Sequence, residues 1–336
     1  MSVKATLASQ DISFVIEDNE TILEAALRQN ISLPYGCRNG ACGACKAKIV
    51  SGKIHYDNGL PPAISTQEDD VGQALLCSAR AETDLEIEAR TVDSTDDVRI
   101  RKLPCRVTKC EKLSEDVIRL FLELPKTERL QFLAGQYIDI LMRGDKRRSF
   151  SMANPPHEDQ QIELHIRYYD GGLFSEYAFK DLKERALLRI EGPLGTFTLK
   201  ETGRPMIMIA GGTGFAPIKS LIEHALHVDD KREITLYWGV RSENDLYLDD
   251  MARKWAEQYP HINYVPVLSE ADDMTDWQGK TGFVHEAVLA DYADLSGYDV
   301  YACGPPPMID AVVESLPKQG LDRENIYSDS FEFASS

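Results

Sequence analysis

Three cysteines within nine residues carry the clearest chemistry in this sequence. Cys37, Cys42 and Cys45 follow the spacing C-x4-C-x2-C, and Cys77 lies downstream. This spacing is typical of the thiolates that hold a plant-type [2Fe–2S] cluster. The loop around them is rich in glycine and alanine, which lets backbone N–H groups come close to the inorganic sulfides. We therefore expect Cys37, Cys42, Cys45 and Cys77 to bind a [2Fe–2S] cluster.

A structural zinc site is the main alternative for these cysteines. Zinc sites usually consist of paired short C-x2-4-C units, whereas this sequence has a triple and a single cysteine. A disulfide is disfavoured because clustered thiols in a reducing compartment usually bind metal or carry out redox chemistry. Cys105 and Cys110 lie outside the spacing, in an expected strand, and we interpret them as core residues or inert thiols.

A second motif, Arg148-Ser149-Phe150-Ser151, contains three kinds of cofactor-binding side chain. An arginine offers a fork of donors to a pyrophosphate, an aromatic ring can stack on an isoalloxazine, and a serine hydroxyl can reach a flavin N5. Together with the cysteines, this motif resembles the oxygenase-reductase family, in which a plant-type ferredoxin domain precedes a ferredoxin–NADP reductase module. The resemblance covers essentially the full length. The family's motif is R-x-Y-S, so Phe150 keeps the stacking ring and lacks the phenol hydroxyl.

The resemblance implies further flavin contacts. Gly171, Gly172 and Ser175 resemble the family's second flavin phosphate motif, although Asp-Gly-Gly taken alone is a common hairpin turn. Phe331 occupies about the place of a family aromatic residue near the flavin, although terminal aromatic residues often serve only in packing. The residues implied to bind FAD are Arg148, Ser149, Phe150, Ser151, Gly171, Gly172, Ser175 and Phe331.

Residues 207–217 read as a strand, a glycine turn and the start of a helix. Glycines let the backbone approach a pyrophosphate, and the helix N-terminus offers N–H groups. Pro217 suits the first helical turn. The string is G-x-G-x-x-P instead of the usual G-x-G-x-x-G, and it resembles the family's own variant. The residues expected to bind the nicotinamide nucleotide here are Gly211, Gly212, Thr213, Gly214 and Pro217.

The string Cys303-Gly304-Pro305 at the end of an expected strand resembles the family's C-G-P-x-x-M motif. In the family, the cysteine and the glycine-proline turn lie beside the nicotinamide ring. The alternative is a buried strand cysteine followed by a proline that ends the strand. The resemblance implies that Cys303 and Ser151 lie at the reacting centre, and that Gly304 and Pro305 contact the nucleotide.

The nicotinamide is expected to be that of NADH. NADPH needs cations for its 2′-phosphate, and here Arg241 is followed by two acidic residues, Glu243 and Asp245. Asp245 or Glu243 can accept a hydrogen bond from the ribose 2′-hydroxyl. The resemblance implies that hydride passes from NADH to FAD, and that single electrons pass through the cluster to a partner protein.

The acceptor is open at this point. Three strings, beginning at Arg147, Arg189 and Thr281, look most like CDP-6-deoxy-3,4-glucoseen reductases, which feed electrons to a dehydrase. Reductases of aromatic-ring or hydrocarbon oxygenases are nearly as similar. A free-flavin or ferric reductase, and a non-enzymatic zinc protein with a degenerate nucleotide fold, are alternatives from other classes. Members of the family are commonly monomers.

The pattern of apolar residues predicts three folded parts that position these motifs. The resemblance implies that residues 1–92 form the ferredoxin domain with a β-grasp-like fold, and the residues themselves predict a short helix that follows a capping box of Thr21 and Glu24. Residues 93–102 read as a polar linker. Successive strands in residues 103–202 predict an antiparallel β-barrel that binds FAD. Alternating strands and helices in residues 203–336 predict an α/β domain with a parallel sheet, which binds NAD.

Length and composition agree with such a multidomain protein. The 336 residues suggest two or three domains. The net charge of −18 disfavours binding to nucleic acid or anionic lipid. No apolar run approaches the roughly 20 residues of a membrane helix, and the first residues lack the pattern of a secretory signal. We therefore expect a cytoplasmic protein that binds neither nucleic acid nor membrane.

Overall fold

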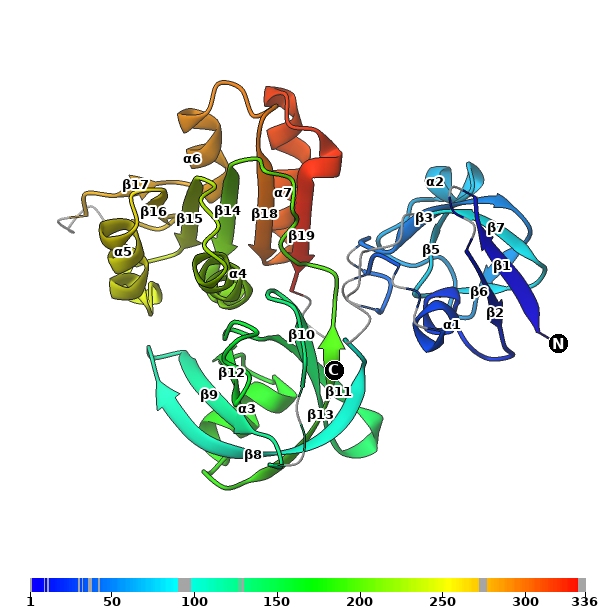
Figure 1. Ribbon diagram of the computed structural model, residues 1–336, viewed down its shortest axis with the longest axis horizontal. Coiled ribbons are helices and arrows are strands. Elements are labelled where there is room, and N and C mark those ends of the chain that lie inside the picture. The colour runs from blue at the N-terminus through cyan, green and yellow to red at the C-terminus, as the bar shows by residue number, and fades with distance from the viewer. Residues whose placement is uncertain are drawn as a thin grey trace. The chain divides into compact units, whose positions relative to one another are not determined.

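The computed structural model describes the chain except for residues 1, 9, 11, 30, 32, 36–37, 42, 90–97, 127, 129, 272–276 and 332–336. It divides into two compact units, Met1–Arg99 and Ile100–Ser336 (Figure 1). Among the described residues, no helix has both the length and the apolar character needed to cross a lipid bilayer.

The first unit is built on a five-stranded mixed sheet with the order β2-β1-β7-β3-β5. Strand β1 is antiparallel to β2 and parallel to β7. Buried and exposed residues alternate along β1 and β2, as expected for strands with one face toward a core. The elements of this unit are β1 (Val3–Leu7), β2 (Ser13–Ile16), α1 (Ile22–Arg28), β3 (Lys46–Ser51), β4 (Ile54–Tyr56), α2 (Thr66–Asp70), β5 (Gln73–Leu75), β6 (Ala79–Ala81) and β7 (Leu85–Glu88).

Helix α1 has the predicted capping box. The Thr21 hydroxyl accepts from the backbone N–H of Glu24 at 3.2 Å, and the Glu24 carboxylate accepts from the backbone N–H of Thr21 at 2.8 Å. Such a cap contributes about 1 kcal/mol to helix stability. The N–H of Leu23 donates to the carbonyl of Leu76 at 3.0 Å. The start of α1 therefore holds the backbone segment that carries Cys77.

The second unit begins with an antiparallel barrel of six strands in the order β11-β10-β13-β8-β9-β12. A bridge between Met152 and Leu164 joins its first and last strands. Inward-facing apolar side chains, such as Leu120 and Leu164, fill the interior. The elements are β8 (Arg101–Lys112), β9 (Val117–Glu123), β10 (Tyr137–Leu141), η1 (Arg143–Asp145), β11 (Arg147–Ser151), β12 (Gln161–Arg167), α3 (Leu173–Lys180) and β13 (Leu187–Leu194).

The rest of this unit is a six-stranded parallel sheet with the order β17-β16-β15-β14-β18-β19. Its central strand β14 is buried along its whole length, which is typical of a parallel sheet covered on both faces. Helices α4 and α5 pack on one face, and α6 and α7 on the other (Figure 1). The elements are β14 (Met206–Gly211), η2 (Gly212–Gly214), α4 (Phe215–His227), β15 (Ile234–Val240), η3 (Glu243–Asp245), α5 (Asp249–Gln258), β16 (Ile262–Leu268), β17 (Lys280–Thr281), α6 (Val284–Asp291), β18 (Asp299–Gly304), α7 (Pro306–Ser315), η4 (Leu316–Gln319), η5 (Arg323–Asn325) and β19 (Ile326–Ser330).

The expected fold class is confirmed, with differences at the element boundaries. Strand β8 begins at Arg101, so the last two residues of the segment expected as a linker, 93–102, belong to the barrel. Helix α4 starts at Phe215, earlier than the apolar pattern of residues 218–226 indicates. The sequence does not predict strand β19, because its residues IYSDS are all half-buried and show no apolar alternation. The barrel and the parallel sheet share one core, whose buried members include Val117 of β9, Phe197 and Phe215 of α4.

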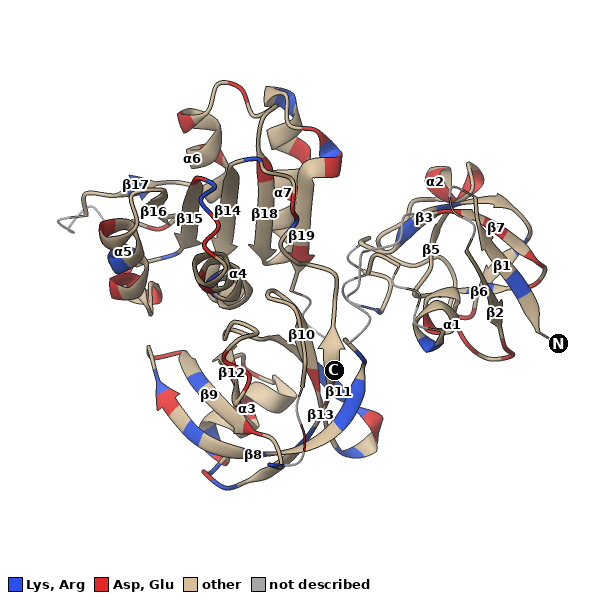
Figure 2. Cartoon of the chain, in the orientation of Figure 1, with Lys and Arg blue, Asp and Glu red and all other residues tan. Residues whose placement is uncertain are grey.

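Charged residues are unevenly spread over the elements (Figure 2). Helix α2 contains three acidic residues and no basic one. Strand β8 contains Arg101, Lys102, Arg106, Lys109 and Lys112 against the single acid Glu111. The net charge of −18 therefore does not describe every surface of the protein.

Candidate functional site

Cys45 and Cys77 lie on adjacent segments of the first unit. Cys45 precedes β3 and Cys77 follows β5, and the N–H of Leu76 donates to the carbonyl of Cys45 at 3.2 Å. Both cysteine side chains are buried, with exposed fractions of 4% and 7%. Cys37 and Cys42 lie outside the described residues. Within the described part of the chain, no three His, Cys, Asp or Glu side chains are grouped so that they could hold a metal ion.

The backbone beside Cys45 makes a loop that suits a cluster. Gly40 and Gly43 have φ values of 85° and 75°, in the left-handed region that favours glycine. A Cβ on Gly40 would come within 2.8 Å of both Pro61 and Ser78. Buried thiols in a loop of this kind are the soft donors that an iron–sulfur cluster requires. The residues present therefore fit a [2Fe–2S] cluster.

Strand β11 carries the expected flavin residues on its two faces. Arg148 and Phe150 are half-buried on one face, and Ser149 and Ser151 lie on the other, Ser151 being buried. The Ser149 hydroxyl donates to Asp139 of β10 at 2.7 Å. The Phe150 ring packs against Phe174 of α3, with ring centroids 5.3 Å apart. A half-exposed guanidinium beside a half-exposed ring fits a flavin dinucleotide, whose pyrophosphate needs donors and whose ring needs an apolar surface.

The turn before α3 contains the second expected flavin motif. Gly171 has a φ of 73° and opens to solvent, since no heavy atom would lie within 4 Å of a Cβ there. The Ser175 hydroxyl accepts from the N–H of Tyr169 at 3.2 Å and lies 3.3 Å from the carbonyl of Gly172. A Cβ on Gly172 would lie 2.3 Å from that hydroxyl. Ser175 therefore holds the turn together, and the exposed backbone at Gly171 is the part open to a ligand.

The two nucleotide motifs, far apart in the sequence, meet at the carboxyl ends of β14 and β18. These strands are neighbours, and the strand order reverses between them. In open α/β sheets this reversal point is where ligands bind. A Cβ on Gly214 would lie 2.0 Å from the Cys303 carbonyl oxygen, and a Cβ on Gly211 would lie 2.5 Å from the Met308 sulfur. The absence of these Cβ atoms is what allows the two motifs to approach.

Aromatic side chains support residues 211–214, which we call the nucleotide loop. Gly212 has a φ of 54°, and its carbonyl accepts from the Trp238 indole N–H at 2.9 Å. The Trp238 ring stacks on Phe215, the first residue of α4, with centroids 3.9 Å apart. Pro217 lies in the first turn of α4, as predicted. These contacts therefore hold the loop in place beside the N-terminus of α4, and the two together suit the binding of a pyrophosphate.

Cys303 is fully enclosed beside this loop. Burial, assisted by the negative charge of Asp329, raises the pKa of the Cys303 thiol well above its usual range. The group is therefore a neutral thiol and not a nucleophilic thiolate. The N–H of Phe331 donates to the carbonyl of Gly304 at 2.9 Å. Phe331 thus lies next to the Cys303-Gly304 turn, which its sequence position alone did not indicate.

Arg167, at the end of β12, was not singled out from the sequence. A Cβ on Gly212 would lie 3.1 Å from its Nη1, so the guanidinium covers the nucleotide loop. Its Nε lies 3.2 Å from Asp116 and its Nη2 lies 3.5 Å from Asp245. Both nitrogens are buried and, among the described residues, make no hydrogen bond. The sequence signal that could have pointed to Arg167 is a basic residue at the end of an expected strand, just before the Gly171 turn.

The two acids expected near the ribose lie in different surroundings. Asp245 accepts hydrogen bonds from the backbone N–H and the hydroxyl of Ser242, both at 3.0 Å. Its other oxygen lies 3.5 Å from Arg167 and 3.9 Å from Arg241. Glu243 instead lines a cavity of about 550 Å³ with Arg253, Trp277 and Lys280, among others. Asp245 is therefore the acid that faces the cations near the nucleotide loop.

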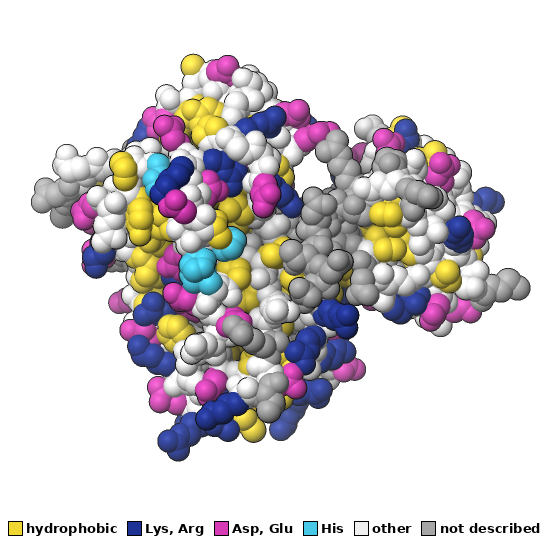
Figure 3. Space-filling view, in the orientation of Figure 1, with side chains coloured by type: hydrophobic (Ala, Val, Ile, Leu, Met, Phe, Trp, Pro, Cys, Tyr) yellow, Lys and Arg dark blue, Asp and Glu magenta, His cyan; other side chains and the backbone are white. Residues whose placement is uncertain are grey.

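Histidine side chains gather on one face of the second unit (Figure 3). The rings of His157 and His227 stack with centroids 3.6 Å apart.

Cys105 and Cys110 lie away from the cofactor motifs: Cys105 is in the barrel core and Cys110 packs against it. Burial raises the pKa of the Cys105 thiol to about 12, which agrees with an inert thiol.

Models of known protein families match all three parts of the chain. The 2Fe-2S iron-sulfur cluster binding domain matches residues 5–82, the oxidoreductase FAD-binding domain residues 104–199, and the oxidoreductase NAD-binding domain residues 208–314. The first match supports the iron–sulfur interpretation of the cysteines over the zinc alternative.

Three known proteins are similar to this chain over almost its whole length. The CDP-6-deoxy-L-threo-D-glycero-4-hexulose-3-dehydrase reductase of Yersinia pestis is 41% identical over 331 residues, which is 98% of this chain and 99% of that protein. The phenol 2-monooxygenase reductase component DmpP of Pseudomonas sp. (strain CF600) is 35% identical, covering 98% of this chain and 95% of that protein. The crystal structure of the Amycolatopsis cytochrome P450 reductase GcoB superposes with a TM-score of 0.82 at 33% identity, covering 99% of this chain and 100% of that one.

Proposed function

This chain belongs to the ferredoxin–NAD(P)H reductase-type oxygenase reductases that carry an N-terminal [2Fe–2S] domain, and from that premise we propose how its residues serve electron transfer. When bound, FAD accepts a hydride from NADH, and the [2Fe–2S] cluster passes electrons on singly. The proposal concerns which side chains of this chain hold the three groups and how they act.

Each group has its own set of side chains. Cys45 and Cys77, with Cys37 and Cys42, hold the cluster, because buried thiols on joined segments are suitable donors. Arg148 binds the flavin pyrophosphate. The residues that complete the flavin site are Ser149, Phe150, Ser151, Gly171, Gly172, Ser175 and Phe331.

The nucleotide loop and the Cys303 turn hold the nicotinamide nucleotide. Gly211, Gly212, Thr213 and Gly214 offer backbone N–H groups at the start of α4, and Pro217 continues that helix. Arg167 supplies a cation over the same loop. The residues on the far side of the loop are Cys303, Gly304 and Pro305. The contact between Gly214 and Cys303 is the observation that carries this assignment.

The nucleotide is NADH and not NADPH. The carboxylate of Asp245 lies within 4 Å of both Arg167 and Arg241. It would repel a 2′-phosphate and neutralise the two cations that such a phosphate needs. Among the alternatives raised above, Asp245 therefore fits the role of the discriminating acid better than Glu243.

The acceptor is a partner enzyme, either a deoxysugar dehydrase or the oxygenase component of a multi-component oxygenase. The relatives described above include the reductases of a CDP-hexulose dehydrase and of phenol 2-monooxygenase. The greater identity to the former, 41% against 35%, favours the dehydrase. Thiolate ligands of this kind persist in reducing compartments, so we infer a cytoplasmic protein.

An anaerobic titration of the purified protein with NADH, followed by visible absorption and EPR, tests this function. We expect the flavin absorption to bleach and a reduced [2Fe–2S] signal to appear. The same titration with NADPH is the control, and it should require a much higher nucleotide concentration. Bleaching without a cluster signal would contradict the role of the first unit and favour a free-flavin reductase instead.

A further inference from the structure

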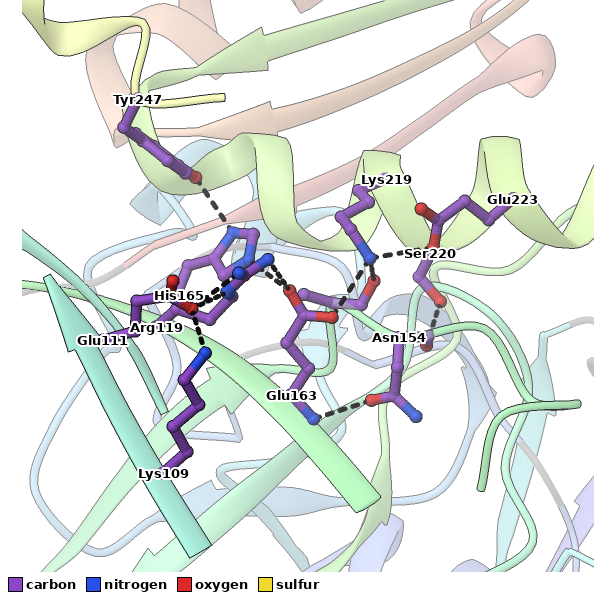
Figure 4. A network of polar contacts seen from close by, with 11 residues as sticks. Lys109, Glu111, Arg119, Asn154, Glu163, His165, Lys219, Ser220, Glu223 and Tyr247 are labelled. Carbon is purple, nitrogen blue, oxygen red and sulfur yellow. Dashed lines mark hydrogen bonds and ion pairs between the residues drawn. The ribbon is translucent and has the colours of Figure 1, made fainter. Parts of the chain in front are cut away.

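A buried lysine joins the barrel to the parallel sheet at α4 (Figure 4). Lys219 has an exposed fraction of only 4%. Its ammonium lies 3.1 Å from Glu163 of β12 and 2.8 Å from Glu223, and it donates to the carbonyl of Ala153 at 3.1 Å. Burying such a charge is costly unless good geometry and additional hydrogen bonds compensate. All three partners of this ammonium are therefore needed to hold it inside the protein.

Glu163 continues the chain of polar contacts into the barrel (Figure 4). Its other oxygen lies 2.9 Å from Nε2 of His165, whose Nδ1 lies 3.1 Å from the Tyr247 hydroxyl. A carboxylate can only accept, so Nε2 carries the hydrogen and Nδ1 accepts from Tyr247. Burial lowers the pKa of His165, which keeps the ring neutral. Burial opposes ionisation of Glu163, but the His165 hydrogen bond and the Lys219 charge bring its pKa down to about 2.

The same contacts tie the flavin strand to the nucleotide helix. Ala153 and Asn154 lie two and three residues after Ser151, the last residue of β11. Their carbonyls accept from the Lys219 ammonium at 3.1 Å and the Ser220 hydroxyl at 2.8 Å. Lys219 and Ser220 lie on α4, which starts at Phe215, directly after the nucleotide loop. Two neighbouring carbonyls after the flavin strand are thus bonded to two neighbouring side chains of the nucleotide helix.

We propose that Lys219 and Glu163 are positioning residues that set the distance between the nucleotide loop and the flavin strand β11. This inference rests on the proposed function. Both side chains are buried, and they contact the Ala153 carbonyl, Glu223 and His165, so they act through α4, β12 and the segment after β11. A misplacement of about 1 Å can slow a reaction about 100-fold, because it removes the reacting atoms from their productive separation.

A double substitution distinguishes a positioning role of Lys219 and Glu163 from a role in folding stability alone. Removing one partner leaves an unpaired buried charge and destabilises the protein, whereas replacing both partners with apolar residues of similar volume is often neutral or stabilising. The variant Glu163→Gln/Lys219→Met removes both charges and should remain folded. The glutamine amide oxygen can still accept from Nε2 of His165, and Glu223 is 23% exposed, so water can solvate its carboxylate. Lys231→Met is the matched control, since Lys231 is an exposed lysine of the same unit, paired with Asp229.

The experiment compares wild type, double variant and control, each loaded with FAD. It measures flavin content, melting temperature, the NAD⁺ dissociation constant, the nicotinamide–flavin charge-transfer absorbance and the single-turnover rate with NADH and 4-deuterated NADH. For the double variant we expect unchanged flavin content, melting temperature and NAD⁺ affinity. We also expect loss of the charge-transfer absorbance and a rate that falls about 100-fold, with the isotope effect fully expressed.

Two results would contradict this inference while leaving the proposed function intact. One is a double variant with the wild-type charge-transfer absorbance and rate. The other is a double variant whose rate loss is matched by an equal loss of NAD⁺ affinity, because Lys219 would then act in binding. If the wild-type protein itself is not reduced by NADH, the proposed function fails, and the inference fails with it.

Discussion

Replacing Gly214 with alanine tests the central contact of the nucleotide site. An added Cβ would lie 2.0 Å from the carbonyl oxygen and 2.5 Å from the carbonyl carbon of Cys303. Both atoms belong to the backbone of β18, so no side-chain rotation can relieve the clash. Ordinary contact distances are near 3.5 Å, so the two segments must separate by about 1 Å or more. The nucleotide loop and the Cys303 turn cannot then keep their present spacing.

The size of the effect follows from that separation. Overpacking of this kind costs about 1–3 kcal/mol of folding stability, and each kcal/mol lowers the melting temperature by about 2–4 °C in a unit of this size. A shift of about 1 Å at the reacting centre reduces the rate about 100-fold. That loss corresponds to about 2.7 kcal/mol of activation free energy. We therefore expect Gly214→Ala to lose about 100-fold in activity while its melting temperature falls by about 2–12 °C.

The assay measures kcat/KM for NADH with ferricyanide as acceptor, NAD⁺ binding by calorimetry, and thermal unfolding. Gly297→Ala is the matched control, because no heavy atom lies within 4 Å of the added Cβ and its φ is not in the left-handed region. The control should keep wild-type values. Wild-type kcat/KM and melting temperature in Gly214→Ala would refute the close packing of the loop on Cys303.

Three further predictions follow from the site. Cys45→Ser should lower the iron content and abolish reduction of cytochrome c, while NADH–ferricyanide activity persists; unchanged cytochrome c reduction would contradict an exit through the cluster. Asp245→Asn keeps an acceptor for Ser242 but frees Arg167 and Arg241, so the NADPH/NADH ratio of kcat/KM should rise about tenfold, and a constant ratio would exclude Asp245 as the discriminating acid. Glu163 has a pKa lowered from 4.5 to about 2, so its contribution to stability is present above pH 4.5 and is lost as the pH falls toward 2. Denaturant unfolding of Glu163→Gln over that range should show a weaker pH dependence than wild type.

Much of the site could be predicted because its motifs are local. The spacing of Cys37, Cys42 and Cys45 reports ligand chemistry directly, since the ligands share one loop. The strand, glycine turn and helix start around Gly211 also lie within one short segment, and their conformational preferences act over a few residues. The capping box at Thr21 is equally local.

Other elements could not be predicted because local patterns do not reveal them. Strand β19 has no apolar alternation, and it forms because β18 offers it an edge to pair with. Lys219 and Arg167 looked like ordinary charged residues of a helix and a strand. Their importance depends on burial at a junction between two parts of the second unit, which composition and periodicity do not encode.

The sequence by itself thus determined the cofactor chemistry and the order of the three parts. The tertiary structure alone decided that Gly214 meets Cys303, that Arg167 covers Gly212, and that the segment after β11 is bonded to α4. The physical reason is the range of the forces involved. Ligand spacing and turn conformation depend on neighbouring residues, whereas these contacts join residues distant in the chain, and they exist only once the barrel and the sheet share a core.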